Sequence, residues 1–111
     1  MERLNILESF EDFRNRIAET FKMDGLSENL KSEIDRWSER RQQETDVPGV
    51  TLEQRTDFQI EFADICDVIG NHDRAWEILG DAWEVTDGQL NKRVEDAMDI
   101  IMERADDSEL P

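Results

Sequence analysis

Apolar residues recur at every third or fourth position over most of the chain, which is the spacing of helices that bury one face. Asp24-Gly25 ends a first predicted helix, which starts near residue 2 and carries the stripe Leu7, Phe10, Phe13, Ile17 and Phe21. Ser27 can cap a second helix, whose narrower stripe is Leu26, Leu30, Ile34 and Trp37. Because SERRQQETD after Trp37 has no apolar residue, we expect this helix to fray near residue 44.

Three further helices are predicted after a break at TDVPGV, residues 45–50, where Pro48 and Gly49 favour a turn. Thr51 and Gln54 form a capping-box pattern before a third helix with the stripe Phe58, Phe62, Ile65 and Ile69. Gly70-Asn71 is a turn, and the face of the fourth helix carries Ala75, Trp76, Leu79, Ala82 and Trp83, with Ile78 beside it. Thr86 and Gln89 repeat the capping pattern before a fifth helix with the stripe Leu90, Val94, Ala97, Met98, Ile101 and Ala105.

These stripes predict an all-α single domain of about five helices, and their short connections favour an antiparallel helical bundle. We expect residues 1–44 to form an N-terminal helical pair and residues 45–50 to be a turn or hinge. Residues 51–105 then form a three-helix unit, and residues 106–111 a frayed acidic tail.

We expect the two helices around Gly70 to pack tightly, because small residues stand where they would cross: Ala63, Ala75 and Ala82. With the large apolar residues Phe62 and Leu79, these positions make residues 56–87 resemble a single tetratricopeptide-type (TPR-like) helical hairpin. The chain departs from the family at two positions: Gln59 stands where the family has an aromatic residue, and the proline that usually ends the unit is replaced near Asp87. The resemblance implies a protein-binding scaffold whose groove recognises a peptide or a helix.

The charge of the chain restricts the class of partner. It has 29 acidic and 13 basic residues, a net charge of −16 that opposes direct binding to nucleic acid or to anionic lipid. Such a charge favours a protein partner with a basic surface, although general solubility or adaptation to a salty cytoplasm would explain it equally well. The charged N-terminus MERLNILESFEDFRN, the single Cys66 and the absence of a long apolar run predict a cytoplasmic protein with no membrane span.

Carboxylates on one face of the third helix are the first candidate partner-binding site. The row comprises Glu53, Asp57, Glu61 and Asp64, which we expect to face away from the core. It either docks on Arg and Lys residues of a partner or reflects a polar face in a very acidic chain. Trp37, followed by Arg40 and Arg41, is the second candidate: either a partly exposed interface anchor or a residue that packs on the first helix.

The sequence predicts no catalytic, cofactor-binding or metal-binding residues. It has no Glu-x-x-His pair, calcium loop or glycine-rich phosphate loop, and the single His72 has no obvious partner in the sequence. Cys66 lies in an apolar helix and is expected to be a buried core residue.

We therefore expect a non-enzymatic acidic protein–protein interaction module, acting as an adaptor, a chaperone or an assembly factor on a basic or helical partner. The alternative is an inhibitor, phage-encoded by hypothesis, that mimics nucleic acid and occupies the basic site of a DNA- or RNA-binding protein. A third hypothesis is a homo-oligomer whose N-terminal helices pair between chains.

Overall fold

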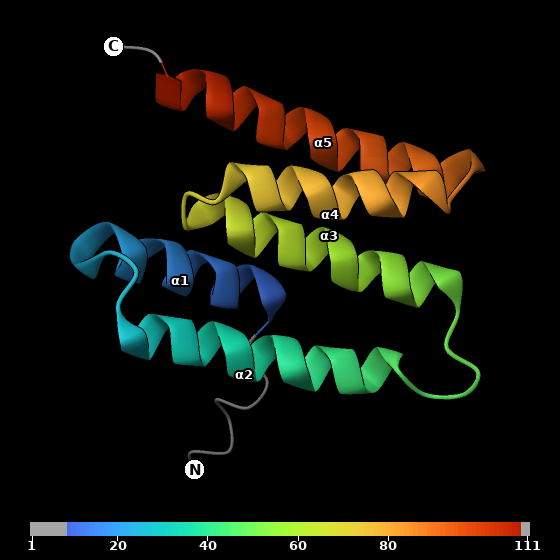
Figure 1. Cartoon of the computed structure of the whole chain (residues 1–111), viewed down its shortest axis with the longest axis horizontal. Coiled ribbons are helices and arrows are strands. Elements are labelled where there is room, and N and C mark those ends of the chain that lie inside the picture. Colours follow the sequence, from blue (N-terminus) through green and yellow to red (C-terminus); the bar gives the residue numbers. More distant parts are fainter. Residues whose placement is uncertain (1–8, 110–111) are drawn as a thin grey trace.

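The computed structural model describes residues 9 to 109, and these residues form five helices and no strand (Figure 1). The helices are α1 (Phe10–Asp24), α2 (Glu28–Thr45), α3 (Leu52–Val68), α4 (His72–Glu84) and α5 (Gly88–Glu109). Consecutive helices run in opposite directions, so the predicted all-α antiparallel bundle is confirmed. With extents of 45 × 39 × 20 Å, the bundle is flat, about two helices thick.

Helix α3 is the central element, because it contributes to both hydrophobic cores. The N-terminal core joins α1, α2 and α3 through Phe13, Ile17, Leu30, Ile34, Trp37 and Ile65. The C-terminal core joins α3, α4 and α5 through Ala63, Cys66, Ala75, Ile78, Leu79, Ala82, Val94 and Ile101. The N-terminal helices thus pack on α3 of the same chain, and the segment around Pro48 is a loop within one bundle.

The helix boundaries follow side-chain caps. Ser9 is extended (φ −71°, ψ 162°) and accepts a hydrogen bond from the Asp12 amide, so α1 begins at Phe10 and not near residue 2. Leu7 lies outside the described residues. The Ser27 cap is confirmed, and so is the capping box of Thr51 and Gln54, with hydrogen bonds of 2.9 and 3.1 Å.

The capping box predicted at Thr86 and Gln89 is wrong. The Thr86 hydroxyl donates instead to the Ala82 carbonyl at 2.9 Å and so completes the end of α4. The side-chain amide of Asn91 then donates to the Trp83 carbonyl at 3.0 Å, which ties the start of α5 to the end of α4. At its other end α5 extends to Glu109, past the predicted boundary at residue 105.

The buried face of α4 also differs from the prediction. Trp76 and Trp83 are 40% and 45% exposed, whereas Ile78 is buried. Helix α4 packs between α3 and α5 (Figure 1), so its buried arc is centred on Ala75, Ile78, Leu79 and Ala82. The two tryptophans lie at the edge of that arc.

Candidate functional site

The predicted acidic row on α3 is paired with arginines of this chain. Arg93 of α5 binds Asp57, and its Nη1 lies 3.4 Å from Glu53. Arg41 of α2 binds Glu61 at 2.9 Å.

The last residue of the row is the most extensively paired. Asp64 lies 3.4 Å from Arg14 of α1 and 2.9 Å from Arg104 of α5. The row therefore connects α3 to α1, α2 and α5. Its expected orientation away from the rest of the fold is wrong beyond Glu53, because the exposed fraction of the side chain falls from 68% at Glu53 to 26% at Asp64.

A buried carboxylate adjacent to the predicted row continues this network. The Asp67 side chain has no exposed surface, and it accepts hydrogen bonds from Arg104 Nη1 at 2.6 Å and from the His72 ring. His72 therefore does have a partner, which the sequence did not reveal although the two residues are only five positions apart. Asp67 joins the end of α3 to the start of α4 and to α5, and its surroundings are those of a structural ion-pair cluster.

Trp37 is buried, only 7% exposed, so the second of its two predicted roles holds. Its ring stacks on Phe13 at a centroid distance of 5.4 Å and contacts Phe10, Phe58 and Phe62 at 5.8 to 6.3 Å. It forms the floor of a groove of about 680 Å³ between α1, α2 and α3.

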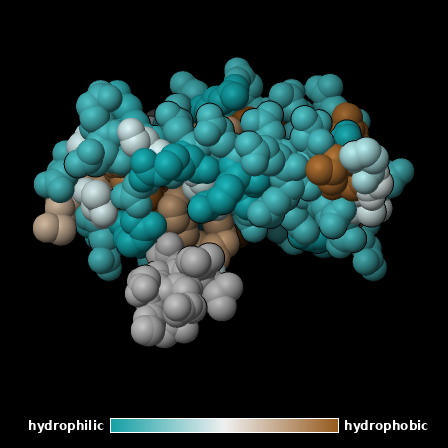
Figure 2. Space-filling view, turned by 90° about the horizontal axis from the view of Figure 1, so that it is seen from below, coloured by the Kyte–Doolittle hydropathy of each residue, from teal (hydrophilic) through white to brown (hydrophobic). Residues whose placement is uncertain are grey.

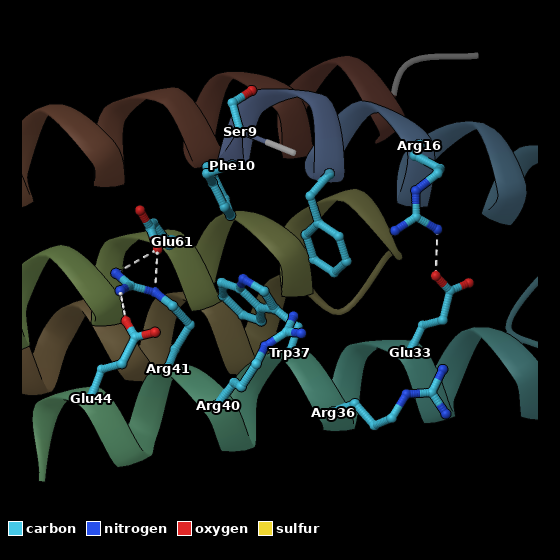
Figure 3. A pocket seen from close by; sticks show the side chains of 11 residues that line it. Ser9, Phe10, Arg16, Glu33, Arg36, Trp37, Arg40, Arg41, Glu44 and Glu61 are labelled. Atoms are coloured by element: carbon cyan, nitrogen blue, oxygen red, sulfur yellow. Dashed lines mark hydrogen bonds and ion pairs between the residues drawn. The ribbon is translucent and has the colours of Figure 1, made fainter. Parts of the chain in front are cut away.

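Charged side chains border this groove, and most of them pair with one another. Figure 3 shows Arg16 reaching Glu33 at one side, and Arg41 reaching Glu44 and Glu61 at the other. Burial raises the pKa of Glu61, and Arg41 offsets only part of this effect. The remaining cations, Arg36 and Arg40, are exposed on α2 and form no ion pair with a described residue. The groove is thus a region of mixed charge above a floor that belongs to the core.

The edge of the bundle along α2 is hydrophilic over most of its area (Figure 2). In contrast, the outer side of α4 and α5 exposes large apolar groups. Trp83 Nε1 donates to Glu95 of α5 at 3.1 Å, so Trp83 leans toward α5.

The register of α4 and α5 extends this apolar surface to two methionines. Because the helices are antiparallel, the Trp83–Glu95 contact places Trp76 level with Met102, which is 50% exposed, and Gly80 level with the partly buried Met98. Glu95, Met98 and Met102 share one face of α5. We call Trp76, Gly80, Trp83, Met98 and Met102 the α4–α5 apolar strip.

Carboxylates surround this strip. Asp73 and Glu84 on α4 and Asp99 on α5 are exposed and form no ion pair with any residue between 9 and 104. Glu77 is paired only with its neighbour Arg74, at 2.8 Å. The strip therefore combines exposed aromatic and thioether groups with unneutralised negative charge, which the acidic row on α3 does not offer.

Two further candidates are core residues. Cys66 is buried, and burial raises the pKa of its thiol, which opposes nucleophilic chemistry. Thr56 is fully buried on α3, and its hydroxyl oxygen has no hydrogen-bond partner among the described residues. Within the described residues, no group of three or more His, Cys, Asp or Glu side chains is arranged to hold a metal ion.

Comparisons of the chain with protein families, with curated proteins and with solved structures found no match. The tetratricopeptide resemblance of residues 56–87 thus stays a prediction, although Ala63, Ala75 and Ala82 are all fully buried between the helices, as it requires. None of the described helices is long and apolar enough to cross a membrane.

Proposed function

We propose that this protein is a non-enzymatic interaction module that binds a protein partner through a basic surface or a basic helix of that partner. In this proposal it acts in the cytoplasm as an adaptor, a chaperone or an assembly factor. It needs no cofactor and contacts neither nucleic acid nor a membrane directly.

The exposure of Trp76 and Trp83 within an acidic surface is the observation that carries this proposal. Exposure of a large indole ring to water is unfavourable, and tryptophan is enriched among the residues that dominate the binding energy of protein interfaces. The net charge of −16 adds long-range attraction to a basic partner and raises the rate of encounter.

The alternative, an inhibitor that mimics nucleic acid, requires a row of carboxylates that are free to imitate phosphates. Glu53, Asp57, Glu61 and Asp64 do not favour it, because arginines of the same chain pair with each of them. Other carboxylates would have to carry that function, and no spacing among them supports it specifically.

Calorimetric titration with synthetic peptides tests the proposal. The probe is a Lys/Leu peptide that forms an amphipathic helix of about 18 residues, and the control has Glu in place of each Lys. We expect saturable one-to-one binding of the Lys/Leu peptide, weakened between about 50 and about 500 mM NaCl, and no binding of the Glu/Leu peptide. Absence of saturable binding at low salt, or equal binding of both peptides, would overturn the proposal.

A further inference from the structure

The middle of α4 contains a glycine that the packing of this chain does not explain. A Cβ atom built on Gly80 would meet no atom of the described residues within 4 Å, and Gly80 is not among the glycines that adopt a positive φ. Glycine within a helix is about 1 kcal/mol less favourable than alanine. The fold itself would therefore accept a side chain here, and its absence leaves open space on the outer surface of α4.

This space lies between the two exposed tryptophans. Trp76, Gly80 and Trp83 occupy one side of α4, and the Cα atoms of the two tryptophans are about 10 Å apart along the helix axis. Met98 of α5 lies level with Gly80 and provides a polarisable, adaptable side chain beside it. The spacing is sufficient for one aliphatic or aromatic side chain of a partner between the indole rings.

The surrounding charge indicates what accompanies that side chain. Asp73 and Glu84 on one side and Asp99 on the other form no ion pair with a described residue, and Glu95 accepts the hydrogen bond of the Trp83 indole. Arg and Lys side chains can pair with these carboxylates and also stack on the faces of the indole rings. These carboxylates would repel an acidic partner segment.

From these observations we infer that the α4–α5 apolar strip is the docking site for a basic amphipathic segment of a partner protein. One apolar side chain of that segment inserts above Gly80 between Trp76 and Trp83, and flanking Arg or Lys residues pair with Asp73, Glu84 and Asp99. This inference rests on the proposed function and names its site and the chemistry of its ligand.

Substitution of Gly80 tests the insertion directly. Gly80→Leu fills the space with a side chain that is compatible with an exposed helical position. We therefore expect the variant to fold and to bind the Lys/Leu peptide with an affinity at least tenfold lower than that of wild type. Gly80→Ala is the matched control, and it should retain affinity within about threefold while increasing thermal stability. Equal affinity of wild type and Gly80→Leu would overturn the site but leave the proposed function standing, whereas failure of wild type to bind would overturn both.

Truncation of an indole ring provides the second arm. We expect Trp83→Ala to weaken binding about tenfold or more, and Leu52→Ala, which removes an equally exposed apolar side chain from α3, to leave it unchanged. Circular dichroism on each variant verifies that the fold is retained. Equal losses in both variants would show that binding does not depend on this strip, and would overturn the inference.

Charge neutralisation provides the third arm. Glu84→Gln with Asp99→Asn should lower the affinity about fivefold at low salt and reduce its salt dependence, because two direct pairs are lost. Asp35→Asn with Glu39→Gln removes the same charge from exposed positions of α2 and should have a smaller effect.

If light scattering shows that wild type dimerises and that Gly80→Leu abolishes the dimer, the strip binds a second copy of the chain, and the inference of a basic partner is wrong.

Discussion

At the scale of single residues, the side chains that depart from their expected surroundings are the most informative. Asp67 is charged and buried, Thr56 is buried with an unsatisfied hydroxyl, and Trp76 and Trp83 are apolar and exposed. Arg104 and His72 pair with Asp67. Thr56 has no hydrogen-bond partner among the described residues, and the indole rings of Trp76 and Trp83 are only partly covered by the bundle. These residues show where stability is not optimised, and each of them can be tested by substitution.

Thr56→Val should stabilise the protein by about 1 kcal/mol, because it replaces a buried hydroxyl that lacks a partner with a methyl group of similar shape. Urea denaturation measures the change in the free energy of unfolding. Thr51→Val is the matched control, and it should destabilise by about 1 kcal/mol because the Thr51 hydroxyl caps α3. A loss of stability in Thr56→Val would indicate that its hydroxyl has a partner in solution.

The contribution of Glu61 to the stability of the fold should decrease as pH rises, whereas the contribution of an ordinary paired carboxylate increases with pH. Its pKa in the folded protein is raised above 4.5, chiefly by burial, so the folded state takes up the proton more readily than the unfolded chain. This contribution is present below pH 4.5 and is lost as pH rises through the raised pKa.

Comparison of wild type with Glu61→Gln isolates this effect. We expect the free energy of unfolding of wild type, relative to the variant, to decrease between about pH 4 and about pH 7. Glu44→Gln removes the exposed partner of the same Arg41 and is the control, since Glu44 is not enclosed by the bundle. A relative stability that increases with pH would contradict the assignment of burial as the dominant cause.

At the scale of elements, α3 is held by two apolar faces and by ion pairs to α1, α2 and α5. Its carboxylates are four residues apart for most of the row, so they lie along one side of the helix and can meet arginines from several neighbours. Exposed pairs such as Arg93 with Glu53 contribute little, whereas the buried Asp67 cluster is costly to disrupt.

Asp67→Asn should therefore destabilise the protein by about 2 kcal/mol, because Arg104 and His72 both lose a buried carboxylate partner, although Arg104 keeps its pair with Asp64. Asp81→Asn, on the exposed side of α4, should change stability by less than about 0.5 kcal/mol. Thermal and urea denaturation of the two variants provide the measurement. Equal stability of both would mean that the cluster forms no strong interaction in solution.

At the scale of the whole molecule, the excess of negative charge opposes compaction. The acidic residues outnumber the basic ones by more than two to one, so repulsion persists after the arginines have paired. The flat bundle, 20 Å thick, places most of these charges at the surface, where salt screens them.

We expect the melting temperature to rise between about 10 and about 300 mM NaCl, because screening of net repulsion outweighs the weakening of exposed ion pairs. Differential scanning calorimetry measures this shift. An equal ionic strength of potassium chloride should have the same effect if screening is the cause. A melting temperature that falls with salt would mean that the ion pairs of α3 dominate over the net charge.

The sequence by itself determined the five helices, their turns and most of their caps, because these depend on residues within a few positions of one another. The Ser27 cap, the Thr51–Gln54 capping box and the turn at Gly70 are local in this sense. Cys66 was also predicted to be buried, since an apolar stripe surrounds it.

Only the tertiary structure decided which polar groups pair and which aromatic residues remain exposed. The partners of Asp64 and Asp57 are 40 and 36 residues away along the chain, so no local pattern reveals them. Helical periodicity places Trp76, Trp83 and Leu79 on one face, but the extent of that face that is buried depends on how many neighbours the helix has. Because α4 is enclosed by α3 and α5, its buried arc is centred on Ile78 and Leu79, and the two tryptophans beside Gly80 face solvent.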